Sequence, residues 1–355
     1  MLTNKDGAIN NKIMRTTSDE TDEKYWKEYI SHNKAVSIEA PLLFSENFLI
    51  YKERQNGKIN VIVLDLRNNK RNYIDFPDPF YFIYNISKDD SDNKKIKIAY
   101  SSYITPYTEY EYDLEQKELK ITFQSEIKGF DQSLYSAEKV WATTDNGVKV
   151  PISLCYRKDL IKKDGNNPLF LDGYGAGGDT NPEYFDAFRL SLLDRGGIFA
   201  VAHIRGSGYL GVKWHEEGKL MNKTNSFTDF IACAEFLIKD KFTSSNKIAA
   251  FGRSYGGYLV GSVLSKRPDL FRFAFLQVPG VNFLDDLLDK DPFFTSCIVD
   301  EIGNSEIKEE FEVLLKNCPF HNIQKGSYPF IHVLAGLTDT RNNYWGPMKW
   351  VAKIR

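Results

Sequence analysis

The sequence is poor in cysteine, and its cysteines are not spaced as a disulfide framework or a zinc site requires. Cys155, Cys233, Cys297 and Cys318 lie far apart and form no C-x-x-C pair. No apolar segment is long enough to cross a bilayer, and residues 1–12 lack the apolar stretch of a signal peptide. We therefore expect free thiols in a cytoplasmic chain that has no membrane partner.

An excess of charge of either sign is also missing. The 355 residues include 46 Lys and Arg and 48 Asp and Glu, which gives a formal net charge of −2. This balance provides no basic surface of the kind that binds phosphate backbones, so a nucleic-acid partner is not expected. The hydrophobic share of 42% is sufficient for a folded core, and the length suits two domains better than one.

Motifs that hold cofactors are absent as well. The sequence contains no G-x-x-x-x-G-K-[ST] loop and no strand-led G-x-G-x-x-G followed by a ribose-binding acid. The acidic cluster of Asp285, Asp286, Asp289 and Asp291 lacks the glycine and terminal glutamate of an EF-hand loop. We interpret it as a solvated helix face, and we expect neither a cofactor nor a metal.

What the sequence does contain is two regions with different hydrophobic periods. Between residues 41 and 128, short strand-like segments alternate with polar turns, as in FLIYKE, QNGK and INVIVLDL. Such hairpins predict propeller blades or a sandwich. After about residue 136, apolar runs that end in glycine or a polar turn alternate with helical stretches, a pattern typical of an open parallel α/β sheet. We place the boundary near residue 128, with domains at 1–128 and 129–355.

The segment 248–257 places a G-x-S-x-G motif between a predicted strand and a predicted helix. In this setting the motif is a nucleophile elbow, where glycines allow the strand and helix to pass closely and leave the hydroxyl of Ser254 exposed. The turn would also aim the backbone N–H of Tyr255 at an oxyanion. The alternative interpretation is a glycine-rich turn with only a structural role.

A serine nucleophile requires a histidine base, which in turn requires an orienting carboxylate. Asp339 follows the apolar run PFIHVLAG and is the natural acid, although it could instead be a solvated turn aspartate. No histidine follows Asp339. The five histidines are His32, His203, His215, His321 and His332. We expect His203 and His332 to be core residues, and we expect the proton acceptor to be missing from this chain.

Several strings together resemble the prolyl oligopeptidase family of serine peptidases, most of all its oligopeptidase B branch. They are LSLLDRGGIFAVAHIRGSGYLG from residue 190, KWHEEGKLMNKTNSFTDFIACAEFLI from residue 213, GRSYGG from residue 252 and YWGPMKWVAKIR from residue 344. The resemblance extends upstream through ITPYTEYEYDL, from residue 104. It implies an α/β-hydrolase domain preceded by the closing blades of a β-propeller.

The resemblance also implies roles for individual residues. Ser254 would be the nucleophile and Asp339 the triad acid. The hydroxyl of Tyr174 would bind the oxyanion together with the N–H of Tyr255, and Arg341 would bind a substrate carbonyl. The expected substrates are short peptides, because a propeller of this family admits peptides and excludes folded proteins.

Departures from the family pattern affect specificity. Oligopeptidase B uses acidic residues to select basic side chains. The positions that correspond to its first subsite are Ile298 and Asp300 in this sequence, so only Asp300 remains as a substrate-binding carboxylate. For the second subsite they fall at Pro182 and Tyr184, so both are lost. Asn342, three positions after Asp339, replaces an apolar residue of the family pattern, and Gly346 replaces an acidic one.

Compared with the family, the sequence is expected to begin inside the propeller and to end before the histidine loop. We therefore predict a truncated peptidase that is nearly inactive as encoded, with a complementing C-terminal fragment as a conceivable partner. Two alternatives stay open. One is a non-catalytic remnant that binds peptides or a partner, and the other is an esterase of the same fold.

Overall fold

The computed structural model describes residues 1–355 except 90, 291–295 and 297, so Asp291 and Cys297 lie outside the described residues. The chain divides into two compact units. The first contains Met1–Gln132, Pro182–Ala187 and Tyr209–Lys213. The second contains Ser133–Asn181, Phe188–Gly208 and Trp214–Arg355.

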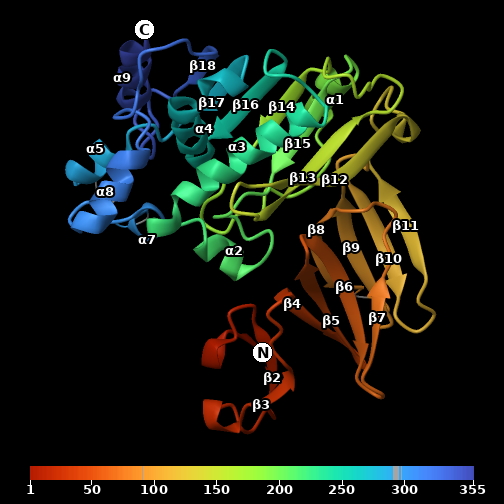
Figure 1. The fold of residues 1–355 in the computed structure, drawn as a ribbon. Coiled ribbons are helices and arrows are strands. Elements are labelled where there is room, and N and C mark those ends of the chain that lie inside the picture. The colour runs from red at the N-terminus through yellow and green to blue at the C-terminus, as the bar shows by residue number, and fades with distance from the viewer. Residues whose placement is uncertain (90, 291–295, 297) are drawn as a thin grey trace. The chain divides into compact units, whose positions relative to one another are not determined.

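The first unit is built from antiparallel sheets (Figure 1). Two sheets have four strands each, in the orders β4-β5-β6-β7 and β11-β10-β9-β8, and a third has the order β1-β2-β3. The strands are β1 (Leu2–Thr3), β2 (Lys12–Arg15), β3 (Lys27–Ile30), β4 (Ser37–Ser45), β5 (Phe48–Gln55), β6 (Lys58–Asp65), β7 (Lys70–Ile74), β8 (Phe82–Lys88), β9 (Lys95–Ser101), β10 (Thr108–Asp113) and β11 (Leu119–Gln124). Four-stranded antiparallel sheets of this kind are the blades that the hairpin pattern predicted.

The β5–β6 hairpin shows how the sequence produces a blade. Asn56 and Gly57 form its two-residue turn with φ of 52° and 75°, which matches the twist of the flanking strands. The strand β5 is apolar on both faces because both are covered: Phe48 and Ile50 pack into the core between the two four-stranded sheets. Leu49, on the opposite face, packs against the three-stranded sheet.

The second unit contains one seven-stranded sheet in the order β12-β13-β15-β14-β16-β17-β18. Strands β14 to β18 run parallel, whereas β12 and β13 pair antiparallel at one edge. The strands are β12 (Tyr135–Thr143), β13 (Lys149–Arg157), β14 (Leu169–Asp172), β15 (Ile198–Ala202), β16 (Ile248–Arg253), β17 (Phe273–Gln277) and β18 (Phe330–Leu334). The five apolar runs of the sequence therefore form the parallel strands, as predicted.

Helices connect these strands (Figure 1). They are α1 (Ala187–Leu193), α2 (Val212–Glu216), α3 (Thr224–Lys239), α4 (Tyr255–Lys266), α5 (Phe283–Leu288), α7 (Val299–Ile302), α8 (Lys308–Asn317) and α9 (Trp345–Ile354). Helix α3 buries Phe227, Phe230 and Leu237 on one face, which is the spacing of an amphipathic helix. Among the described residues, none of the helices combines the length and the apolar character that crossing a bilayer requires.

The strand order places a switch point in the middle of the sheet. The chain leaves β14 for β15 on one side and later returns to β16 on the other side. The loops that follow β14 and β16 therefore diverge at the carboxyl edge of the sheet, which is where α/β proteins build ligand sites. Tyr174 lies in the loop after β14, and Ser254 follows directly after β16.

Candidate active site

Ser254 lies in a sharp turn between β16 and α4. Its backbone has φ 54° and ψ −111°, a conformation that side-chain-bearing residues rarely adopt. The turn is held by hydrogen bonds: the N–H of Ser254 donates to the carbonyl of Gln277 at 2.9 Å, and the N–H of Gly280 donates to the carbonyl of Ser254 at 3.1 Å. This is the elbow geometry that the motif predicted.

Three glycines make the turn possible. A Cβ on Gly252 would lie 1.9 Å from the carbonyl oxygen of Gly256. A Cβ on Gly256 would lie 2.7 Å from the carbonyl oxygen of Gly173, and one on Gly257 would lie 2.3 Å from the Cβ of Pro279. Each distance is too short for a real side chain, so the helix can approach the strands this closely only where glycine is present.

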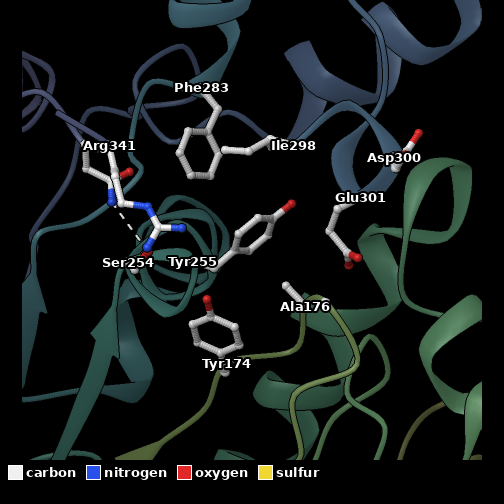
Figure 2. A pocket seen from close by; sticks show the side chains of 11 residues that line it. Tyr174, Ala176, Ser254, Tyr255, Phe283, Ile298, Asp300, Glu301 and Arg341 are labelled. Atoms are coloured by element: carbon white, nitrogen blue, oxygen red, sulfur yellow. Dashed lines mark hydrogen bonds between the residues drawn. The ribbon is translucent and has the colours of Figure 1, made fainter. Parts of the chain in front are cut away.

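Two hydrogen-bond donors lie beside the Ser254 hydroxyl. Tyr255 is the first residue of α4, so its N–H has no carbonyl partner within the helix. The side chain of Tyr174 points into the same pocket (Figure 2). Burial raises the pKa of Tyr174, while its hydrogen bond with Ser254 lowers it. Because the net shift is upward, the phenol is neutral and able to donate at neutral pH.

The loop after β18 contains Asp339, the predicted acid. Its Oδ1 accepts hydrogen bonds from the N–H groups of Arg341 at 2.8 Å and Asn342 at 3.0 Å. The side-chain amide of Asn342 donates to the hydroxyl of Ser254 at 3.4 Å, the dashed line in Figure 2. Asn342 thus connects the acid loop to the elbow. From the sequence, Asn342 was recognised only as a departure from the family pattern.

Four histidines belong to the second unit, and their recorded side-chain partners are groups other than the Ser254 hydroxyl. His215 Nε2 is 2.8 Å from Glu301, and His321 Nε2 is 2.7 Å from Asp285. His203 is buried and its Nε2 is 2.8 Å from the hydroxyl of Ser153, so the expectation of a core residue is confirmed.

The expectation for His332 is wrong. His332 is exposed on β18 and lies against Phe275, because alternate side chains of this strand face outward. His32 belongs to the first unit. Among the described residues, which include all five histidines, the Ser254 hydroxyl accepts a side-chain hydrogen bond from Asn342 and from no histidine.

A cavity of about 280 Å³ opens beside Ser254 (Figure 2). Five of the six predicted site residues line it together: Tyr174, Ser254, Tyr255, Asp300 and Arg341. Asp339 is not among the lining residues and reaches the site through its bond to Asn342. The side chain of Asp300 is exposed and its carboxylate points away from the cavity, whereas Ile298 points toward it (Figure 2). Pro182 and Tyr184 belong to the first unit.

An ionic cluster that sequence reasoning missed closes one end of the cavity. Lys223, 2% exposed, donates to the carbonyl of Gly175 at 2.7 Å, and its Nζ lies 3.5 Å from Glu301 Oε1. Burial lowers the pKa of Lys223 to about 8. Burial opposes ionisation of Glu301, but the hydrogen bond from His215 and the charge of Lys223 outweigh it and lower the pKa of Glu301. No local motif signals this cluster, because its members come from distant segments.

Comparison with known proteins agrees with this geometry. Residues 183–355 match the model of the prolyl oligopeptidase family, and residues 1–125 match that of the prolyl oligopeptidase N-terminal beta-propeller domain. The chain is 35% identical over 99% of its length to dipeptidyl aminopeptidase BI of Pseudoxanthomonas mexicana. The chain belongs to the prolyl oligopeptidase family. The resemblance inferred from the sequence is therefore confirmed, and so is the combination of propeller blades with a hydrolase domain.

Other relatives point to the oligopeptidase B branch of this family. Protease 2 of Moraxella lacunata is 33% identical over 100% of the chain. The solved structure of oligopeptidase B from Leishmania major superposes with a TM-score of 0.89 at 32% identity and covers 100% of the chain. The chain covers 48% of dipeptidyl aminopeptidase BI, 51% of Protease 2 and 50% of the Leishmania structure. It thus spans about half the length of these relatives.

Proposed function

We propose that this chain provides the nucleophile and the oxyanion site of a serine peptidase that acts on short peptides. The observation that carries the proposal is the strained turn at Ser254, with Tyr174 and the N–H of Tyr255 beside the same hydroxyl. A strained serine between a parallel strand and a helix, with two donors alongside, suits acyl transfer. Peptides are the proposed substrates because the relatives are named as peptidases.

The proposed reaction is an acyl transfer in two halves. The hydroxyl oxygen of Ser254 attacks the peptide carbonyl carbon while its proton passes to a base. The carbonyl oxygen becomes an oxyanion that accepts hydrogen bonds from the Tyr174 hydroxyl and the Tyr255 N–H. The base then protonates the leaving amine, and water releases the acyl group by the same steps. Asp339 would orient the base, and Arg341 would bind a second substrate carbonyl.

We also propose that the base does not come from the histidines of this sequence; the proposal is supported by the finding that none of the five, all described, is hydrogen-bonded to Ser254. We therefore propose that the 355-residue polypeptide, tested alone, hydrolyses peptides at a negligible rate. Loss of a triad histidine lowers kcat on the order of a million-fold in a well-studied serine protease. A complementing segment that delivers an imidazole near Asp339 is the proposed partner.

Added imidazole tests this proposal on the chain itself. Hydrolysis of a panel of fluorogenic peptides that differ in the residue before the scissile bond, Arg included, is measured for the wild-type chain and for Ser254→Ala, each with and without imidazole. We expect no difference between the two proteins without imidazole, and an imidazole-dependent rate only in the wild type. An equal effect of imidazole on both proteins would show that Ser254 is not the nucleophile.

A non-catalytic peptide-binding role is the second candidate, favoured by the same missing base. Peptide binding without imidazole-dependent turnover would support it. An esterase of this fold is the remaining alternative. A fluorophosphonate probe combined with ester and peptide panels, again with imidazole, separates esterase from peptidase chemistry.

We also propose that the functional boundary lies near residue 128 and that the protein is cytoplasmic. The division of the structure into two units supports the boundary. The cytoplasmic location is supported by the thiols, because Cys155, Cys233 and Cys318 are free and buried. Expressing residues 129–355 alone and measuring cooperative unfolding would test the boundary.

A further inference from the structure

The side chain of Tyr255 has a property that its backbone role at the elbow does not explain. The residue is 8% exposed, and its hydroxyl has no hydrogen-bond partner among the described residues. Figure 2 shows this hydroxyl directed into the cavity, toward Ile298 and Glu301. Burial and the nearby charge of Glu301 raise the pKa of Tyr255 well above its ordinary value, so the group is a neutral phenol. A buried hydroxyl without a partner is costly, and a ligand in the cavity would remove that cost.

The Tyr255 hydroxyl points toward Glu301, whose negative charge is already offset by neighbouring groups. Glu301 accepts from His215 at 2.8 Å, and the ammonium of Lys223 lies 3.5 Å away. Lys223 is itself fixed, because it donates to Gly175 and lies 4.9 Å from the centre of the Tyr255 ring. A second cation placed here would meet the charge of Lys223 rather than a free acid. The cavity is therefore poorly suited to an arginine or lysine side chain.

Part of the remaining wall is apolar, while Arg341 and Asn342 line the cavity as well. Phe283 and Ile298 face the cavity from one side and Ala176 from another (Figure 2). Asp300, the only acidic residue retained from the expected basic-selective subsite, is exposed and directed away. An occupant therefore needs an apolar stem that lies against these walls and an uncharged end that forms hydrogen bonds with the Tyr255 hydroxyl.

We propose that the Tyr255 hydroxyl determines specificity by selecting a carboxamide side chain, glutamine above all, for the residue on the acyl side of the scissile bond. A carboxamide matches both polar groups at the end of the cavity. Its carbonyl accepts from the Tyr255 hydroxyl, and its amide N–H donates to Glu301, whose carboxylate can accept several hydrogen bonds. An aliphatic side chain leaves the phenol unpaired, and a carboxylate side chain has no N–H to donate to Glu301. This inference rests on the proposed function, because it assumes that a peptide lies beside Ser254.

Binding of product-like peptides tests the inference without requiring turnover. The probes are fluorescein-labelled tetrapeptides that end in Gln, Glu, Met or Arg with a free carboxylate, titrated into the full chain and followed by fluorescence anisotropy. Gln and Glu are matched in shape, and Met matches Gln in length but lacks the amide. We expect the Gln peptide to bind about tenfold more tightly than each of the others, the gain typical of a hydrogen bond to a buried group.

Two variants in helix α4 test whether the Tyr255 hydroxyl is the source of this selectivity. Tyr255→Phe removes only the hydroxyl, and we expect it to reduce the Gln-to-Met ratio to less than about twofold while leaving the melting temperature equal or higher. Tyr258→Phe removes a hydroxyl from a tyrosine that does not line the cavity, and we expect the ratio to stay near tenfold.

The outcomes separate the two proposals. Tightest binding of the Arg peptide, or a ratio that Tyr255→Phe does not change, would overturn the carboxamide inference while leaving a peptide site in place. Failure of all four peptides to bind would overturn the inference together with the peptide site on which it rests.

Discussion

The elbow and the acid loop lie in the same unit but are held very differently. Every residue from Tyr255 to Leu264 is buried in α4, and backbone fits against backbone at Gly252 and Gly256. On the acid side, β18 has no buried residue, and Leu337 in the following loop is 77% exposed. The nucleophile is therefore positioned by a rigid core, whereas the predicted acid is positioned mainly by hydrogen bonds within its own loop.

The same contrast is visible across the whole sheet. Strand β15 is buried at every position, whereas β17 exposes Phe273 and Phe275 and β18 exposes Phe330 and Leu334. The four side chains share one face, because Phe273 pairs with Phe330 and Gln277 with Leu334. The nucleophile side of the site is thus the stable side, and variants on the two sides should differ in their effects on unfolding.

The largest effect is expected from Gly252→Ala. Its new Cβ would lie 1.9 Å from the carbonyl oxygen of Gly256, and neither backbone segment can move without disturbing α4. We predict a loss of about 3 kcal/mol in the free energy of unfolding, measured by urea denaturation. Gly326→Ala is the matched control, because no atom lies within 4 Å of the position of its Cβ. Equal stability of the two variants would show that the elbow is not tightly packed.

Lys223→Met should alter the pH dependence of stability. Burial lowers the pKa of Lys223 from 10.5 in the unfolded chain to about 8 in the folded chain. Between these values the unfolded chain binds more protons, so this group makes the free energy of unfolding rise with pH. We predict that wild type gains about 2 kcal/mol relative to Lys223→Met between pH 8 and 10.

The control for this prediction is Lys308→Met, which removes an exposed lysine. It should follow wild type at every pH. Parallel curves for wild type and Lys223→Met would contradict the lowered pKa of this ammonium.

A smaller effect is expected from relieving backbone strain at the nucleophile. Ser254→Gly removes the side chain from a position with φ 54°, whereas Ser254→Ala keeps a Cβ there. We predict that the glycine variant is more stable than the alanine variant by about 0.5–1 kcal/mol, after allowing for the greater freedom of glycine in the unfolded chain. A more stable alanine variant, in the same urea experiment, would mean that the turn carries no strain.

The smallest effect is expected in the acid loop. Asp339→Ala removes the acceptor for the N–H groups of Arg341 and Asn342, but the loop is partly solvated and water can replace it. We predict a loss of about 0.5 kcal/mol or less, and a smaller loss still for Asp339→Asn, which keeps an acceptor. If Asp339→Ala lowered the free energy of unfolding as much as Gly252→Ala does, the acid loop would be held as tightly as the elbow.

The sequence predicted the parts of this molecule that depend on local patterns. Apolar runs ending in glycine marked the parallel strands, the Asn56-Gly57 turn marked a hairpin, and the G-x-S-x-G motif marked the elbow. The contacts of Lys223 with Glu301 could not be predicted, because the two residues are 78 positions apart. The exposure of His332 was missed for a related reason: an apolar run does not reveal whether both faces of its strand are covered.

The most direct test of the account is the initial rate of peptide hydrolysis by the purified 355-residue chain at neutral pH, with no base added. A positioned hydroxyl without a proton acceptor should give a rate equal to that of Ser254→Ala. Turnover by the wild type that disappears in Ser254→Ala would contradict the account, because it would require a proton acceptor within the chain.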